Sequence, residues 1–350
     1  MSITPRTAPA GPMSPRPASL TVLLALGVAA WLAETRPAQA QSPGATADLE
    51  ARMAPAHVFL PAMQSMGVGC QPELVVQNLG AEPSKAVLLT WQEPGFCPPE
   101  SNGPLMAECS GLLAPGAAWT FGEAQVPAGS VSGALFSFNL RRLSELGLQL
   151  TFDDVAADLM CERLYYKVVG NGAAYADFLQ SFRAGTDFAG LPLARLVGGP
   201  IGAQWIERCA GGQPGYNAQR PSQASQPADD AAGGYLSFLP WVEPDWTLQV
   251  QNLGLGCAQA EVWFSVAPGE AKTCEVLSIA PGDARSLRVG DCVDRAAGAW
   301  IRASQPVAVV ARLARDGHWA SYSGQGGGGS LQHLVLPRLG SALRVYVQDP

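Results

Sequence analysis

The chain has 350 residues, with 22 Lys and Arg against 29 Asp and Glu, which gives a net charge of −7 at pH 7. Binding to nucleic-acid phosphates needs clustered basic side chains, and the longest basic run here is Arg141-Arg142, so nucleic acid is not an expected partner. The length allows about two domains.

The first 40 residues have the pattern of an export signal. Arg6 and Arg16 precede an apolar run over residues 20–33, and Ala38-Gln39-Ala40 is a small-x-small cleavage pattern. The run is shorter than the roughly 20 residues of a membrane helix, so cleavage is favoured over an uncleaved anchor, the alternative. No later stretch is apolar enough to cross a bilayer. Residues 1–40 hold three Arg and one Glu, so the remainder has 19 basic and 28 acidic residues, a net charge of −9.

One sequence pattern occurs three times after the signal. An apolar-Leu-Pro segment is followed by a strand that contains a glutamine. The three copies are Phe59-Leu60-Pro61 with Val76-Gln77-Asn78, Phe238-Leu239-Pro240 with Val250-Gln251-Asn252, and Val335-Leu336-Pro337 with Val347-Gln348-Asp349. A repeat at domain-sized spacing indicates that one folded unit was duplicated. Residues 41–56, before the first copy, are rich in Ala and Pro and are predicted to be a disordered leader.

Each of the first two copies opens a series of short apolar, β-branched runs. In the first unit these runs cover residues 73–79, 86–91, 118–121 and 133–140, and in the second unit residues 246–253, 260–266, 298–301 and 306–313. Ala114-Pro115-Gly116 and Ala280-Pro281-Gly282 are matching turns, and we align Gly133 with Gly298 and Tyr216 with Tyr322. Six or seven short strands per unit predict a mainly β fold of two tandem antiparallel β-sandwich domains, over residues 57–218 and 235–324.

The first unit carries an insertion at about residues 141–210 in which the period becomes helical. Apolar side chains recur at i, i+3, i+4 and i+7, and Gly185 is placed to end that helix. These side chains are Tyr175, Phe178, Leu179 and Phe182. Residues 153–169 are a second predicted helix, and residues 200–209 fit a helix and a strand equally well. We interpret the insertion as a partly helical cap on the first sandwich.

Composition predicts two linkers, residues 219–234 and the glycine-rich start of residues 325–350. The rest of 325–350 is the partial third repeat, whose two strands cannot bury a core by themselves. Either they pair onto the edge of the second sandwich, or the chain is a shortened version of a longer array.

All eight cysteines follow the signal, and an even count in an exported chain favours disulfides. We expect one bridge inside the insertion between Cys161 and Cys209, and one between Cys274 and Cys292. Two of the three cysteines Cys70, Cys97 and Cys109 are expected to pair at one end of the first unit. No Cys-x-x-Cys occurs, so neither zinc nor another metal is expected, and no cofactor is indicated.

Six motifs mark the second unit, namely Phe238-Leu239-Pro240, Val250-Gln251-Asn252, Ala280-Pro281-Gly282, residues 298–301, Ser304-Gln305-Pro306-Val307-Ala308-Val309 and Ser321-Tyr322-Ser323-Gly324. In these motifs the second unit resembles the tandem, Ig-like β-sandwich repeats of exported bacterial cell-surface proteins. The first unit matches only at landmarks and lacks the Gln-Pro-Val segment. The resemblance implies an extracellular module without catalytic residues.

Trp241 and Trp246 flank a short connection in the second unit and are the predicted binding residues, because exposed tryptophans can stack on sugars. Trp263 and Trp300 lie in strands and are expected in the core. The Val-Gln-Asn element could bind a ligand, but we expect Asn to cap a turn and Gln to bond a neighbouring backbone group.

Other chemistry has little support in the sequence. Calcium would need several converging oxygens, whereas three of the aspartates in the insertion fit the acidic first turn of a helix. Those three are Asp153, Asp154 and Asp158, and the other two are Asp177 and Asp187. The chain has three histidines and no Gly-x-Ser-x-Gly motif, so no catalytic residue is predicted.

The sequence therefore predicts a secreted or cell-surface structural or adhesive repeat protein without catalytic activity. The alternatives are a carbohydrate-binding accessory module and, third, an extracellular hydrolase with a cleft between the insertion and the first sandwich. Expected partners are cell-envelope polysaccharide or other surface proteins.

Overall fold

The computed structural model describes residues 56–65, 69–92, 97, 103–139, 153–209, 213–228, 232–267, 270–315 and 318–326. The predicted signal, nearly all of the leader and the third repeat lie outside the described residues. All described residues belong to one compact unit, Ser42–Pro350. None of the described helices is long and apolar enough to cross a membrane.

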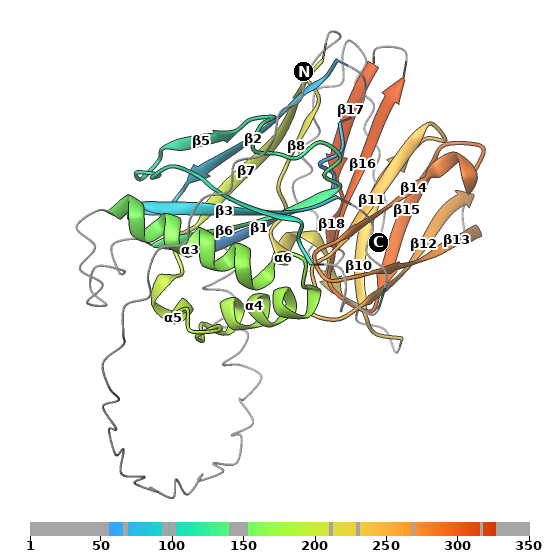
Figure 1. The fold of residues 1–350 in the computed structure, drawn as a ribbon. Helices are drawn as coiled ribbons and strands as arrows, with labels where there is room; N and C mark the ends of the chain where they lie inside the picture. Colours follow the sequence, from blue (N-terminus) through green and yellow to red (C-terminus); the bar gives the residue numbers. More distant parts are fainter. Residues whose placement is uncertain are drawn as a thin grey trace, which may run out of the picture. The chain divides into compact units, whose positions relative to one another are not determined.

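The first sandwich consists of two four-stranded antiparallel sheets with strand orders β1-β6-β3-β4 and β5-β2-β7-β8 (Figure 1). The strands of the first sheet are β1 (His57–Leu60), β6 (Ser132–Asn139), β3 (Ser84–Trp91) and β4 (Met106–Cys109). Those of the second sheet are β5 (Ala118–Phe121), β2 (Gln71–Asn78), β7 (Ile201–Arg208) and β8 (Gly215–Asn217).

The second sandwich repeats this arrangement with strand orders β10-β15-β12-β13 and β14-β11-β16-β17. The strands of the first sheet are β10 (Tyr235–Val242), β15 (Ala297–Ala303), β12 (Ala258–Ala267) and β13 (Glu270–Ile279), and β10 also pairs with the short strands β9 (Gln226–Pro227) and β18 (Gln325–Gly326). Those of the second sheet are β14 (Ala284–Arg288), β11 (Trp246–Asn252), β16 (Val307–Arg315) and β17 (His318–Ser323). A one-turn 3-10 helix, Val289–Asp291, follows β14. The predicted mainly β fold of two tandem antiparallel sandwiches is confirmed.

Ladder register shows that the two sandwiches match strand by strand. Phe59 pairs with Ala134 as Phe238 pairs with Trp300. The Tyr216 hydroxyl accepts a hydrogen bond from the backbone N–H of Ala62 at 3.0 Å, and the matching Tyr322 hydroxyl donates to the carbonyl of Trp241. Ala62 and Trp241 each directly follow the Leu-Pro pair of their own copy. The register therefore supports duplication of one folded unit.

The alignment of Gly133 with Gly298 is wrong by one residue. Gly133 pairs with Leu60, whereas the residue that pairs with the matching Leu239 is Ala299. Both glycines sit near the start of an apolar strand, so the sequence alone offered no way to distinguish the two registers.

The ambiguous segment 200–209 is a strand, β7, that pairs with β2 along its whole length. It is the counterpart of β16, because Asn78 pairs with Ile201 as Asn252 pairs with Val307. Pro200 and Ile201 therefore take the places of Pro306 and Val307, so the strand that the first unit seemed to lack is present. The helical insertion ends before Pro200 rather than at about residue 210.

The insertion forms α3 (Asp153–Val168), α4 (Gly172–Ala184) and α5 (Leu193–Leu196), and the two helices predicted there are confirmed. The amide oxygen of Asn171 caps α4 at the Ala174 N–H, 2.9 Å away, and Gly185 ends the helix with φ +62°. The buried face of α4 is the predicted one, Tyr175, Phe178, Leu179 and Phe182. In Figure 1 the green helices α3 and α4 lie along the sheet that contains β3 and β6.

Buried apolar side chains of the described residues form three clusters. One fills the first sandwich and includes Leu60, Leu88 and Trp205, and another fills the second and includes Val250 and Phe264. The third lies between the outer face of the first sheet and the helices of the insertion. It includes Val87, Leu89, Trp91, Ala134, Phe136, Phe138, Leu164, Tyr175, Phe178 and Phe182. The helices therefore cover a sheet face that would otherwise expose large apolar side chains.

The described part of the predicted linker 219–234 is packed against the second sandwich. It contains the one-turn helix α6 (Pro221–Ala224), and Gln219 and Ser225 are buried. The Gln219 amide accepts from the N–H of Val309 at 3.0 Å and donates to the carbonyl of the same residue at 3.2 Å. The Ser225 hydroxyl accepts from the N–H of Val307 at 3.0 Å. Composition predicts a flexible spacer here, because it does not show that single side chains such as Gln219 and Ser225 are buried and hydrogen-bonded.

Candidate functional site

The predicted binding pair of Trp241 and Trp246 is not formed. Trp246 is only 6% exposed and packs edge-to-face on Tyr322, with ring centroids 5.1 Å apart. Trp241 is half-buried, and its indole N–H donates to the Glu243 carboxylate at 3.3 Å. The pair offers no shared exposed surface for a sugar.

The expectation that Trp263 and Trp300 are core residues is also wrong. In β12 the buried side chains are Ala258, Ala260, Val262 and Phe264, and in β15 they are Ala297, Ala299, Ile301 and Ala303. Because side chains alternate along a strand, Trp263 and Trp300 point to the opposite, outer face of the sheet. Both are partly exposed, and they pair directly across the two strands. The period of two was visible in the sequence and could have identified them.

The two Val-Gln-Asn elements cap turns, as predicted. The Asn78 amide donates to the carbonyls of Glu82 at 2.8 Å and Leu113 at 2.9 Å and accepts from the N–H of Gly80 at 2.8 Å. The Asn252 amide makes the matching bonds: it donates to the carbonyls of Gly256 at 2.7 Å and Ile279 at 2.9 Å and accepts from the N–H of Gly254 at 2.8 Å. The structural interpretation of these asparagines is confirmed.

The two glutamines share one bond but differ in burial. Gln77 is exposed and donates to the Gly116 carbonyl at 3.0 Å, and Gln251 donates to the matching Gly282 carbonyl at 2.8 Å. Gln251 is fully buried and donates a second bond, 3.0 Å long, to Gly133 of the first sandwich. In both sandwiches the glutamine therefore holds its own Ala-Pro-Gly turn. In the second sandwich it also bonds to the first sandwich.

We call the contact between the sandwiches the joint. It is made by the outward-facing side chains of β11 and β16, namely Gln249, Gln251, Ala308, Val310 and Arg312, of which the most exposed is 7% accessible. Val310 belongs to the apolar core of the first sandwich, and Ala308 and Leu253 belong to the cluster under the helices. One face of the second sandwich is thus buried against the first.

The Ala-Pro-Gly turn of the second sandwich inserts into the joint. The Gly282 carbonyl accepts from the Ser132 hydroxyl at 3.1 Å, and a Cβ built on Gly282 would lie 2.3 Å from Trp91 and 2.7 Å from Tyr175. The matching Gly116 has no atom within 4 Å of such a Cβ. Both glycines have positive φ, +79° and +77°. Only the Gly282 turn is therefore enclosed by another domain.

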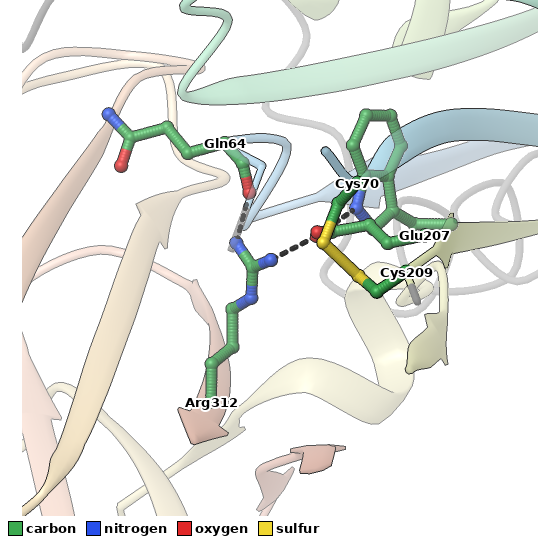
Figure 2. Close-up of a disulfide and its surroundings, with 6 residues drawn as sticks. Gln64, Cys70, Glu207, Cys209 and Arg312 are labelled. Atoms are coloured by element: carbon green, nitrogen blue, oxygen red, sulfur yellow. Dashed lines mark hydrogen bonds and ion pairs between the residues drawn. A yellow bond between two sulfur atoms is a disulfide. The ribbon is translucent and has the colours of Figure 1, made fainter. Parts of the chain in front are cut away.

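A buried ion pair crosses the joint. Figure 2 shows the Arg312 guanidinium between the Gln64 carbonyl, 2.5 Å away, and the Glu207 carboxylate, which also accepts from the Trp205 indole N–H at 3.0 Å. Burial lowers the pKa of Arg312 from its ordinary value, while the negative charge of Glu207 opposes that shift. Removing either charge would leave the other buried without its main partner.

Four disulfides pair all eight cysteines, and one of the predicted pairings is confirmed. Cys274 and Cys292 are bridged, with their Cα atoms 5.3 Å apart. The predicted Cys161–Cys209 bridge is wrong, as is a bridge among Cys70, Cys97 and Cys109. The observed bridges are Cys70–Cys209, Cys109–Cys161 and Cys97–Cys257, with Cα atoms 4.2, 6.2 and 5.9 Å apart.

The reason for the wrong pairings is that sheet pairing overrides closeness in sequence. Cys209 directly follows β7, whose partner β2 directly follows Cys70. Helix α3 packs on β4, which brings Cys161 to Cys109. Cys97 reaches Cys257 in the second sandwich, so a covalent bond also crosses the joint.

The ligand atoms of Cys70, Glu207 and Cys209 lie within 4.8 Å of one another, a spacing that could suit a metal ion. The two sulfurs are bonded to each other, however, and thiolate is the form of cysteine that binds metal. Among the aspartates weighed for calcium, Asp153, Asp154 and Asp158 lie in the first half of α3, and Asp177 and Asp187 are exposed. This placement of the first three fits the predicted acidic start of a helix.

A scan of protein-family models, a search of curated proteins and a search of solved structures found no match to this chain. The resemblance to Ig-like surface repeats therefore remains a prediction from sequence motifs.

Proposed function

We propose that this protein is an exported structural module without catalytic activity, in which two β-sandwiches act as one rigid body at the cell surface or outside the cell. The observation that carries the proposal is the joint. The outer face of β11 and β16 is buried against the first sandwich, and a buried ion pair and the Cys97–Cys257 disulfide cross it. Sandwiches held in this way keep a fixed relative orientation, as a structural or adhesive part requires.

The cysteines support export. All eight are in disulfides, and disulfides persist in oxidising compartments and are rare in the reducing cytosol. The predicted signal over residues 1–40 provides the route.

The packing of the insertion supports a structural role. A hydrolase site between the helices and the first sandwich would need converging polar groups and room for a substrate. The described part of that boundary is filled by aromatic side chains, with the Phe136 ring centroid 4.9 Å from that of Phe178 and 5.0 Å from that of Phe182. The helices act there as a cover for the sheet.

Fractionation of the cells that make the protein tests the export part of the proposal. We expect it in the cell envelope or the medium, with its N-terminus at Gln41 and no free thiols. Recovery from the cytosol with reduced cysteines would contradict export. Hydrolysis of envelope polymers by the purified protein, lost on mutation of a described residue, would contradict the non-catalytic role.

Hydrogen exchange tests the rigid joint. The N–H groups of Val309 and Val307, bonded to Gln219 and Ser225, should exchange as slowly as the N–H groups in the middle of β12. Gln219 is tied to the first sandwich by two backbone hydrogen bonds with Phe59, each 2.8 Å long. Fast exchange at Val309 with slow exchange in β12 would therefore show that the first sandwich separates from β16 in solution.

A further inference from the structure

The outer face of the sheet β10-β15-β12-β13 carries a row of aromatic side chains. Phe238 pairs with Trp300, and Trp300 pairs with Trp263, so the three residues stand side by side across three strands. All three are partly exposed. We call these three residues, with the neighbouring Glu261 and Arg302, the aromatic face.

The two tryptophans are held parallel. Their ring centroids lie 6.2 Å apart, and their planes differ by 5°. Cross-strand pairing fixes both Cβ positions, so the spacing is a property of the sheet and does not depend on a loop. A rigid pair of parallel indoles can bind flat rings at little cost in conformational entropy.

The first sandwich shows what residues this face carries when protein covers it. The counterparts of Glu261, Trp263, Trp300 and Arg302 are Val87, Leu89, Ala134 and Phe136, as the matched pairings of β3 with β6 and of β12 with β15 show. These four counterparts are completely buried under the helical insertion. Two of the four positions in the second sandwich carry charged side chains, and all four are partly exposed. Burying charges under an apolar cover would be costly, so this face suits a hydrated partner.

The charges on the aromatic face also select among hydrated partners. Glu261 and Arg302 pair across β12 and β15, next to the tryptophan pair, so the face itself carries no net charge. The chain as a whole is acidic, at −7, and repels polyanions. A neutral partner fits both facts.

We propose that the aromatic face binds a neutral polysaccharide by stacking sugar rings on Trp263 and Trp300. A pyranose whose hydroxyls are mostly equatorial presents apolar C–H groups on its ring faces, which pack on indole, and hydroxyls at its rim. Glu261 and Arg302 stand next to the tryptophan pair on the same face, and their charged groups can hydrogen-bond to rim hydroxyls, which both accept and donate. The Arg302 guanidinium also donates to the Gly233 carbonyl at 3.4 Å. This inference goes beyond the structural role proposed above and does not depend on it.

The test measures retention of the purified mature chain on insoluble neutral glycans, namely cellulose, chitin and mannan. We expect retention on at least one of them, and a loss of about ten-fold in affinity for both Trp263→Ala and Trp300→Ala. Trp263→Phe and Trp300→Phe keep an aromatic ring and should retain most of the binding. Tyr166→Ala is the control, because it removes a side chain that is 76% exposed on helix α3 of the other sandwich, and it should bind as the wild type does.

Near-ultraviolet circular dichroism and the thermal midpoint of each variant separate loss of binding from loss of fold. The Phe variants keep the test decisive if an Ala variant unfolds. Retention on none of the three glycans, or equal retention of wild type and both Ala variants, would overturn the proposal. A dimer of the wild type that Trp263→Ala converts to a monomer would assign the face to a second copy and would also overturn it. None of these results bears on export or on the joint.

Discussion

The clearest test of the joint compares Gly282→Ala with Gly116→Ala. Both glycines end the same Ala-Pro-Gly turn and have nearly equal positive φ, +79° and +77°. An alanine in this left-handed region costs about 1 kcal/mol in either sandwich. At Gly116 nothing else is touched, because no atom lies within 4 Å of the new Cβ.

At Gly282 the added methyl also collides with the first sandwich. The new Cβ would lie 2.3 Å from a ring carbon of Trp91 and 2.7 Å from one of Tyr175, both in buried side chains. Overpacking of this kind costs about 1–3 kcal/mol beyond the backbone strain. The expected total is about 2–4 kcal/mol for Gly282→Ala, against about 1 kcal/mol for Gly116→Ala.

Urea unfolding followed by tryptophan fluorescence and by far-ultraviolet circular dichroism measures both variants on the same scale. Coincident transitions would establish that a single free energy of unfolding describes each protein. The difference between the two variants isolates the contact across the joint, because the backbone strain is common to both. Equal losses of stability would refute the reasoning and show that the turn is not enclosed in solution.

Three further predictions follow from the same contacts. Gln251→Ala should cost about 1–3 kcal/mol because two buried carbonyls each lose one hydrogen-bond donor, whereas Gln77→Ala at the exposed counterpart should cost less than about 0.5 kcal/mol. Equal losses of stability in denaturant unfolding would contradict the difference in burial. Glu207→Gln should lower the free energy of unfolding by about 3–5 kcal/mol, and adding Arg312→Met should restore a large part of that loss, since no charge of the pair then remains buried. Additive losses of stability in the double mutant would argue against a coupled pair. Burial raises the pKa of Tyr216 above its ordinary value of 10.0, so the unfolded chain loses the hydroxyl proton first and stability falls as the pH rises above about 10. In Tyr216→Phe the thermal midpoint should therefore fall less steeply between pH 9 and 11. A slope equal to that of the wild type would contradict this role.

The duplication illustrates how one sequence element acquires two roles. Asn78 and Asn252 make the same three side-chain bonds, so this part of the repeat serves the turn alone. The leucine that follows is 48% exposed as Leu79 and fully buried as Leu253, whose carbonyl accepts from Arg183 at 2.7 Å. The environment of the repeat, and not its sequence, decides whether the side chain is a surface residue or part of the joint.

Local patterns in the sequence determined the repeat, the sandwich class and the two helices of the insertion. Each of these depends on residues near one another in the chain: a period of two in strands, a period of 3.6 in α4, and turn glycines such as Gly185. The Cys274–Cys292 bridge belongs to the same group, since only 18 positions separate the two cysteines.

Only the tertiary structure decided the joint, the other three disulfides and the cross-strand pairing that places Phe238, Trp300 and Trp263 side by side. These depend on which strands pair and which face is covered, and such contacts join residues as distant as Arg312 and Gln64, 248 positions apart. Strands β12 and β15 alternate between buried and more exposed side chains, whereas their counterparts β3 and β6 are buried on both faces. The outer face of β3 and β6 is covered by an insertion that the second sandwich lacks. A strand pattern separates the two faces of a sheet, but which of them meets water depends on what packs on it from elsewhere in the chain.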